Sequence, residues 1–387
     1  MSNNATNICL TNQQMRLHGN ELEKYLQRFL YPCIVILGIT GNVLNLTVLL
    51  NRSMRSRSNI FLSALALADI IFLLLLLPNI LATYPIFTYN YIYRYIYFHI
   101  KIHLLSLTNW VSSAAIWLVV AVCADRLIGI RRPLHAKTDC NKYRTPLLIV
   151  VIVTVTGIVN FYQHFQYKCF MRNYCHRTQI YSRCIPINND GRWFWNRTNP
   201  YSATYRNFID ISVTVNAVTT IILPIFLLSF LNILLLCILR NRRDLLLVST
   251  NQRRLPKKKR SLQYLKMEHR VTLMVTLIVT TFIILNGPSA VIHLVNLARK
   301  KKLNYNFTLL GNTLVIIDKA CNFILFCLTS KHFRARLFQL TQRKVNRFSA
   351  SFLQIGDSMR RIGSINDDSL QLKQSMKLVQ RNYNNNN

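Results

Sequence analysis

The sequence predicts an all-α membrane protein, a seven-transmembrane helix bundle followed by a short amphipathic eighth helix. Long apolar runs recur along the 387 residues, 51% of which are hydrophobic, and most charges lie between these runs. Each run is close to the ~20 residues that a helix needs to cross a bilayer. A basic soluble protein would instead spread its charges along the chain. The seven runs cover roughly residues 29–50, 59–81, 102–124, 146–165, 209–239, 271–295 and 308–329.

The distribution of basic residues predicts how the spans are oriented. The polar N-terminus has no apolar cleavable signal, so we expect the first run to act as its own anchor. Placing the N-terminus outside puts 31 Lys or Arg residues inside and 16 outside, which agrees with the positive-inside tendency. The sequence therefore predicts a multi-pass plasma-membrane protein with an extracellular N-terminus. Its positive charge follows from this topology and needs no nucleic-acid partner.

The chain is predicted to have four parts. The segment "SKHFRARLFQL" after the seventh run has one hydrophobic face, formed by Phe333, Leu337, Phe338 and Leu340. Such a segment is suitable for binding membrane lipid at the inner surface. The polar, Ser-rich residues beyond it favour disorder. The parts are an extracellular N-terminal tail (1–28), the seven-transmembrane domain (29–329), amphipathic helix 8 (330–340) and a disordered cytoplasmic tail (341–387).

The outer segments carry an even set of cysteines and three glycosylation sequons. Because outer thiols are oxidised, we expect two disulfides, with all three connectivities open. The cysteines are Cys9, Cys169, Cys175 and Cys184. The sequons place glycans at Asn4, Asn196 and Asn306.

In the first outer loop, tyrosines alternate with other residues in "YNYIYRYIY". A period of two is typical of a strand, which would form a ligand-facing ribbon. Aromatic residues also gather at membrane interfaces. We favour an interfacial aromatic belt over the ribbon.

The motif "CADRLIGIRRPLH" ends the third run at its inner side. Arg126 there can be held by its neighbour Asp125 or by an acid on another helix. Glu268, near the start of the sixth run, has a depth that suits pairing with Arg126, which would tie the two helices together. The alternative is an Arg126 side chain that extends to the lipid headgroups, and charge alone favours neither.

The order and spacing of these motifs resemble those of the rhodopsin-like (class A) G-protein-coupled receptors. Asn42 in "GNVLNLTVLL" and Asp69 in "NIFLSALALAD" match signature residues of the first and second spans, and "DRLIGIRRPL" resembles the third-span motif. The later spans match at Pro224, Phe282, Pro288 and Asn322. The fifth and seventh spans look most like those of invertebrate FMRFamide-like neuropeptide receptors.

The sequence departs from that family in ways that bear on activation. No Cys lies at the outer end of the third run, so the family's bridge to the second outer loop cannot form. Leu127 replaces the third-span Tyr, Asn232 the fifth-span Tyr and Asn286 the sixth-span Trp. The resemblance implies that the usual hydrogen-bonded latch of the active state is changed here.

Asp69 and Lys319 are predicted to pair inside the membrane. At ~1.5 Å rise per residue, both lie about 15 Å from the inner ends of their spans. Unpaired charges at this depth are costly, so such residues face inward and pair. In the family resembled, a sodium ion sits beside the second-span Asp. Here Ala115 replaces a third-span ligand, and the Lys319 ammonium stands where the ion would be. Asp318 has no partner evident from the sequence, and we expect it to hold a proton.

The resemblance implies a receptor that activates a heterotrimeric G protein. It implies neither an enzyme nor a cofactor. Phe282 and Pro288 match the hinge of helix six, and the ligand-pocket candidates are Thr108, Asn286 and His293. Thr108 stands where an amine receptor has an Asp. The excess of outer basic residues attracts anions and disfavours a strongly cationic ligand.

We therefore expect an extracellular ligand, with a neuropeptide favoured. A chemosensory receptor for a small anionic ligand is the nearest alternative. An ion or proton transporter is a third, in which Asp69, Asp318 and Lys319 would form the path.

Overall fold

The computed structural model describes residues 8–51, 56–131, 143–189, 193–250, 256–299, 304–329, 333–339, 342 and 346. Side chains are described throughout these ranges except at residues 196, 242–250, 256–271, 297, 299 and 329. The chain divides into two compact units, Met1–Lys331 and His332–Asn387.

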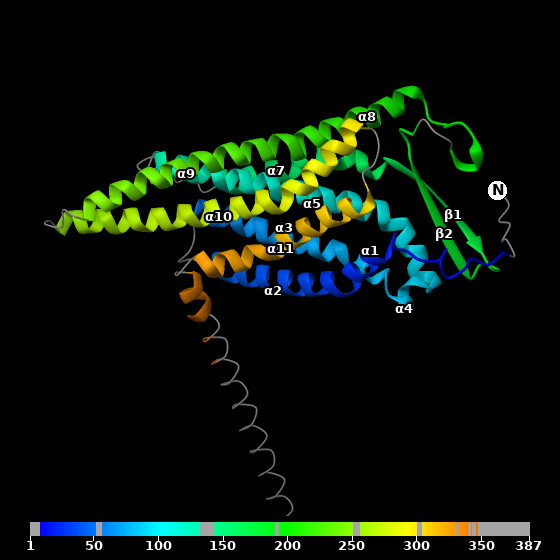
Figure 1. Ribbon diagram of the computed structural model, residues 1–387, viewed down its shortest axis with the longest axis horizontal. Coiled ribbons are helices and arrows are strands. Elements are labelled where there is room, and N and C mark those ends of the chain that lie inside the picture. Colours follow the sequence, from blue (N-terminus) through cyan, green and yellow to red (C-terminus); the bar gives the residue numbers. More distant parts are fainter. Residues whose placement is uncertain are drawn as a thin grey trace, which may run out of the picture. The chain divides into compact units, whose positions relative to one another are not determined.

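Within the described part of the first unit, seven helices are long and apolar enough to cross a membrane. This confirms the predicted fold class, and Figure 1 shows the helices gathered in a bundle. The first three spans are α1 (Glu21–Tyr25) continuing through η1 (Leu26–Leu30) into α2 (Tyr31–Leu49), then α3 (Arg57–Leu81), and after the short α4 (Pro85–Thr88), α5 (Tyr91–Arg131). The last four are α7 (Arg144–Asn160) with η3 (Phe161–His164), α8 (Ala203–Ala217) with η5 (Val218–Ile222) and α9 (Leu223–Thr250), α10 (Pro256–Arg299) and α11 (Tyr305–Thr329).

Polar side chains cap several of these helices. Asn20 accepts a hydrogen bond from the Glu23 amide at the start of α1, and Ser56 accepts one from the Asn59 amide at the start of α3. Ser202 caps α8 in the same way. Such caps satisfy amide groups that lack a partner within the first helical turn.

The third span is longer than the sequence predicted, because α5 begins at Tyr91. The alternating tyrosines are therefore helical, and the ribbon considered for this loop is wrong. The rings of Tyr93 and Tyr97 stack with centroids 5.9 Å apart, and those of Tyr91 and Tyr95 with centroids 6.5 Å apart. Residues four apart are neighbours on a helix, so alternate tyrosines suit a helix as well as a strand.

A β-hairpin, which the sequence analysis did not predict, follows the fourth span. Strands β1 (Tyr167–Tyr174) and β2 (Gln179–Pro186) pair in antiparallel register, with Cys169 opposite Cys184. Burial raises the pKa of the Tyr167 hydroxyl, so this side chain stays neutral near pH 7. Figure 1 shows the hairpin at one end of the bundle, next to the N-terminal segment.

Glycines bring α2 close to its neighbours in the bundle. A Cβ atom on Gly41 would lie 2.7 Å from Cβ of Phe323 on α11, and one on Gly38 would lie 2.5 Å from a Leu73 methyl group on α3. Atoms cannot approach this closely, so side chains at these positions would push the helices apart. The close packing places Asn42 beside the backbone of α11.

In the second unit, residues 333–339 are helical, within the predicted helix 8. Arg336 donates a hydrogen bond from Nη1 to Gln339 Oε1 at 3.1 Å. The predicted disordered tail, 341–387, lies outside the described residues except for 342 and 346.

Candidate functional site

An ion cluster lies within the bundle where α3 packs near α11. Lys319 Nζ is 3.5 Å from Asp69 Oδ1 and 3.5 Å from Asp318 Oδ2. The side chains of Lys319, Asp69 and Asp318 are 1%, 0% and 5% exposed, respectively. The structure thus brings together the pair expected from the sequence. One ammonium group faces two carboxyl groups in a region where an uncompensated charge is costly.

Asp318 has a partner that the sequence analysis missed. The sequence showed no partner for it, and it was expected to hold a proton. The Lys319 side chain is long enough to turn back toward its neighbour while also reaching Asp69 on α3. The ammonium group therefore bridges both acids.

Two amide side chains hold the cluster in place. Asn322 donates from Nδ2 to Asp69 Oδ2 at 2.6 Å. Asn42 donates from Nδ2 to the carbonyl oxygens of Lys319 and Gly38, each at 2.9 Å. These bonds join α2, α3 and α11 around a buried polar core, in which hydrogen bonds to charged groups are stronger than neutral ones.

The cluster also contacts the sixth span. Lys319 Nζ lies 5.7 Å from the ring centroids of both Phe72 and Phe282, a distance at which cations are attracted to aromatic faces. Phe282 is buried on α10, and Pro288 lies further along the same helix. Proline interrupts the backbone hydrogen bonding of a helix and allows it to bend. The predicted hinge residue Phe282 therefore packs against Lys319.

A second region of interest is the hairpin end, which we define as residues 8–20, α4 and the β1–β2 hairpin with the adjoining helix termini. Two disulfides form there from the four predicted cysteines, Cys9–Cys175 and Cys169–Cys184. The first attaches the N-terminal segment to the hairpin turn, and the second crosses the hairpin. Predicting two disulfides was correct, and the structure selects this connectivity.

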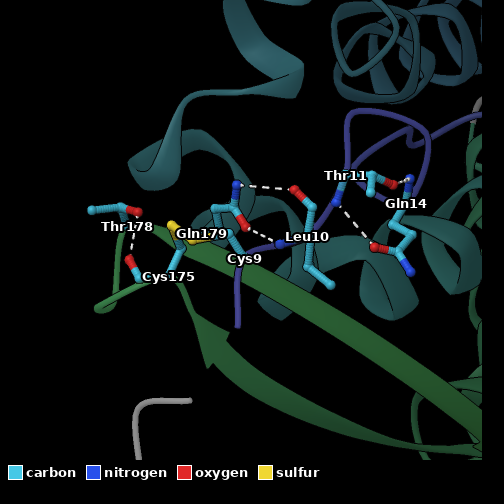
Figure 2. The surroundings of a disulfide bond; sticks show 7 residues. All are labelled: Cys9, Leu10, Thr11, Gln14, Cys175, Thr178 and Gln179. Atoms are coloured by element: carbon cyan, nitrogen blue, oxygen red, sulfur yellow. Dashed lines mark hydrogen bonds between the residues drawn. A yellow bond between two sulfur atoms is a disulfide. The ribbon is translucent and has the colours of Figure 1, made fainter. Parts of the chain in front are cut away.

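Hydrogen bonds reinforce the Cys9–Cys175 link, as Figure 2 shows. The Leu10 amide donates to Gln179 Oε1 at 2.7 Å, and Gln179 Nε2 donates to the Leu10 carbonyl at 3.3 Å. The Cys175 amide also donates to the Ile8 carbonyl at 3.1 Å. The N-terminal segment is thus attached to the hairpin both covalently and by backbone groups.

Arg94 anchors the hairpin end to the third span. Its side chain is completely buried; Nε donates to the Ile180 carbonyl at 2.9 Å, and Nη1 donates to the carbonyls of Met15 at 2.7 Å and Thr88 at 2.9 Å. Its guanidinium carbon lies 5.1 Å from the Phe98 ring centroid. Among the described residues no disulfide joins α5 to the hairpin, and Arg94 makes a noncovalent connection between them. Sequence analysis missed this role, for which an Arg among tyrosines was the signal.

A buried amide network connects α5, α7, η3 and α8 nearer the hairpin end. Asn160 donates to Ser113 Oγ at 3.2 Å, and its Oδ1 accepts from Gln163 and Asn216 at 2.9 and 3.0 Å. Asn109 donates to Gln163 Oε1 at 2.7 Å. The sequence analysis missed this network, although polar residues within apolar runs were its signal.

The predicted ligand-pocket residues occupy different environments. Thr108 is partly buried and donates to the Leu104 carbonyl, while Asn286 is buried and donates to the Phe282 carbonyl. His293 is exposed on α10. Their role in binding a ligand stays a prediction.

A groove of about 340 Å³ lies elsewhere, where α2, α3 and α4 meet near the hairpin end. Its walls are almost entirely apolar, which suits a position facing lipid. The lining residues are Pro32, Val35, Ile36, Leu77, Ile80, Leu81, Tyr84, Ile86 and Phe87.

At the other end of α5, Asp125 accepts a hydrogen bond from Ser58 Oγ on α3. This contact gives Asp125 a partner on another helix. The side chain of Glu268 lies outside the described residues, so its proposed pairing with Arg126 stays a prediction.

Among the glycosylation candidates, Asn306 is exposed in the first turn of α11, where its Oδ1 accepts from Asn20 Nδ2 at 2.6 Å. Asn4 and the side chain of Asn196 lie outside the described part of the chain.

Seven membrane-length helices, with a second-span acid bonded to a seventh-span amide inside the bundle, define a rhodopsin-like G-protein-coupled receptor. Residues 29–344 match the family described as "Serpentine type 7TM GPCR chemoreceptor Srw". The chain therefore belongs to this family of seven-transmembrane receptors.

Similar receptors include invertebrate peptide receptors. The chain is 34% identical over 381 residues to a Caenorhabditis elegans protein named as a G-protein coupled receptor, F59B2.13, covering 98% of this chain and 88% of that one. It is 25% identical to Sex peptide receptor-related protein 2 of C. elegans, covering 79% and 69%. It is 22% identical to the FMRFamide receptor of Drosophila melanogaster, covering 87% and 57%. The protein is thus a multi-pass membrane receptor, and its family is one of receptors rather than enzymes.

Proposed function

We propose that the protein is a plasma-membrane receptor that binds an extracellular peptide at the hairpin end and activates a heterotrimeric G protein. The observation that carries this proposal is the hairpin end itself, where an extended hairpin and the N-terminal segment are linked by a disulfide. Strands and extended segments present backbone groups that peptides can bind. The peptide receptors among its relatives support the same ligand class.

Charge supports a ligand that is not strongly cationic. Two acids, Glu21 and Asp210, already have partners. Glu21 Oε1 is 2.9 Å from Arg16 Nη1 and its Oε2 is 2.6 Å from Lys24 Nζ, and Asp210 Oδ1 accepts from Asn188 Nδ2 at 2.6 Å. Few unpaired acids are therefore left outside to attract a basic ligand. The excess of outer basic residues attracts neutral or acidic ligands to the hairpin end more than basic ones.

Signal transmission would use the contacts between the cluster and α10. Ligand binding biases the relative positions of the spans, and α10 can bend at Pro288 next to the Phe282–Lys319 contact. At the inner end, Arg126 and Glu268 hold α5 and α10 together until a G protein binds. Arrestin binding through the Ser-rich tail is part of the same proposal.

The inner lock is tested by Glu268→Ala, which should raise basal G-protein signalling because it releases the inner end of α10. Signalling is measured per receptor at the cell surface, with Glu21→Ala as a control for removal of an acid. Unchanged basal activity in a well-expressed Glu268→Ala receptor would contradict the lock.

The ligand class is tested in cells that express the receptor with biosensors for each G-protein class. Amidated peptides of equal length that are acidic, neutral or basic are compared with small carboxylates. We expect responses to acidic or neutral peptides. Responses confined to basic peptides would overturn the charge argument, and a complete lack of peptide responses would overturn the peptide assignment.

A second candidate is a chemosensory receptor for a small anionic ligand. The name of the matched family describes chemoreceptors, and the basic outer segments suit an anion. In the same experiment, responses to carboxylates without any response to peptides would favour this function.

A further inference from the structure

A histidine pair lies near the hairpin end, outside the ion cluster and the disulfides. His103 on α5 and His164 at the end of η3 face each other with 2.9 Å between their Nδ1 atoms. Their ring centroids are 5.1 Å apart. Two imidazoles from separate helices thus present the same nitrogen to a common point.

The position is accessible from the membrane boundary. At ~1.5 Å rise per residue, His103 lies about 33 Å along α5 from Asp125, and a bilayer core is ~30 Å thick. His164 is the last residue of the fourth span, and the His103 side chain is exposed on the surface of α5. Both rings therefore lie where water and dissolved ions can reach them.

His99 lies one helical turn before His103 on α5, in the sequence "HIKIH". Its Nδ1 is 2.7 Å from the Tyr95 carbonyl oxygen. A carbonyl only accepts, so Nδ1 carries the proton and Nε2 keeps a free lone pair.

We propose that His103 and His164, with His99 as a third ligand, bind Zn²⁺ at this position. Zinc bound to nitrogen at 2.0–2.1 Å in tetrahedral geometry separates two ligand nitrogens by about 3.3 Å, so the Nδ1 atoms need to part by only about 0.4 Å. No three such ligands are already gathered among the described residues. Rotation of the exposed His99 side chain, which gives up its hydrogen bond to the Tyr95 carbonyl, would complete the set, and water fills the fourth position.

The local charges permit this site. Lys101 lies between the two α5 histidines in sequence, but its ammonium group is directed to the Tyr97 ring, 5.7 Å from the centroid. His164 is held on its other side by the Phe161 ring, whose centroid is 5.7 Å away. Binding requires neutral imidazoles with Nδ1 unprotonated at His103 and His164, so each ring carries its proton on Nε2. The metal would join the outer ends of the third and fourth spans.

The test measures thermal unfolding of the purified full-length receptor in detergent, with added ZnCl₂ or with EDTA. Zinc should raise the unfolding midpoint of the wild type in a saturable manner. His103→Ala and His164→Ala should abolish the saturable shift. His99→Ala should weaken apparent affinity by about tenfold or more, because loss of even an outer-shell partner costs about 10–100-fold. His103→Gln, which keeps an amide to bond His164, guards against a folding defect.

His176→Ala is the matched control, because His176 is exposed in the hairpin turn away from this pair. It should keep the full zinc response. A wild type without a zinc-dependent shift, or one whose shift survives His103→Ala and His164→Ala, would overturn the site. An unchanged affinity in His99→Ala would remove the third ligand. Because binding is measured on purified receptor, these outcomes are separate from the test of signalling.

Discussion

Two buried cations in this bundle are stabilised in different ways. Lys319 lies inside the bundle between two carboxyl groups, whereas Arg94 lies at the hairpin end and donates hydrogen bonds to three backbone carbonyls. A carbonyl carries only a partial charge, so three are needed to surround the guanidinium group. Carbonyls with free lone pairs occur where the chain is not regular helix, as at Met15 and Thr88 near the hairpin end. Between continuous helices most carbonyls already accept a backbone hydrogen bond, and here the buried Lys319 is paired with two acids instead.

The largest effect is expected from breaking the Lys319 cluster. Lys319→Met leaves Asp69 and Asp318 facing each other without a cation, and should lower the free energy of unfolding by about 3–5 kcal/mol. Asp69→Asn should lower the free energy of unfolding by less, because Lys319 remains paired with Asp318. Unfolding midpoints and surface expression are the measurements.

The double variant Asp69→Asn with Lys319→Met sharpens this result. It leaves one buried acid, Asp318, without a cation instead of two, so it should recover part of the loss seen in Lys319→Met. If the two single losses simply add, the pairing is contradicted.

Arg94→Met should lower the free energy of unfolding by about 3 kcal/mol, because it leaves three carbonyl groups without a charged donor. Arg94→Lys keeps the charge but not the forked geometry, so it should be intermediate. The loss should concentrate at the hairpin end, where hydrogen exchange of β1 and β2 should become faster. Equal acceleration in α3 and α11 would show that Arg94 supports the whole bundle.

Removing the Cys9–Cys175 bond by Cys9→Ser with Cys175→Ser should cost about 2 kcal/mol, at the low end of the usual range for disulfides. Inserted helices already restrict the unfolded chain, which limits the entropy that the bond removes. Cys33→Ser is the control, because Cys33 is a free thiol. Mass mapping of the non-reduced receptor should recover the linked peptides; free thiols at Cys9 and Cys175 would refute the connectivity.

The smallest effect is expected from sodium. Lys319 Nζ already compensates Asp69, so replacing sodium chloride with the chloride of a bulky organic cation at constant ionic strength should leave the unfolding midpoint unchanged. A specific stabilisation by sodium would show that the ion still enters beside Asp69.

The spans and the charged pair could be predicted because each leaves a strong mark in the sequence. Span length follows from bilayer thickness, and Asp69 and Lys319 are at matching depths in two apolar runs. The extra partner Asp318 could not be predicted, since it depends on the path of one flexible lysine side chain. The alternating tyrosines fit the period of a strand and also that of a helix. The sequence pattern therefore could not predict that α5 begins as early as Tyr91.

The hairpin end was harder to predict than the membrane region. Four outer cysteines indicate two disulfides, but their connectivity depends on strand register, which places Cys169 opposite Cys184. Arg94 is one of many basic residues, and only the folded chain shows that it lies among carbonyls. Local geometry, rather than composition, determines the contacts there.

The Cys9–Cys175 bond also makes the first four spans part of one covalent ring. The ring cannot close until the fourth span has been inserted and Cys175 has reached the same side of the membrane as Cys9. The N-terminal cysteine must therefore remain a reactive thiol while the next 166 residues are synthesised. Once the ring is closed, a single proteolytic cut in any loop within it leaves both pieces joined, so maturation of this receptor includes an oxidation step that comes midway along the chain.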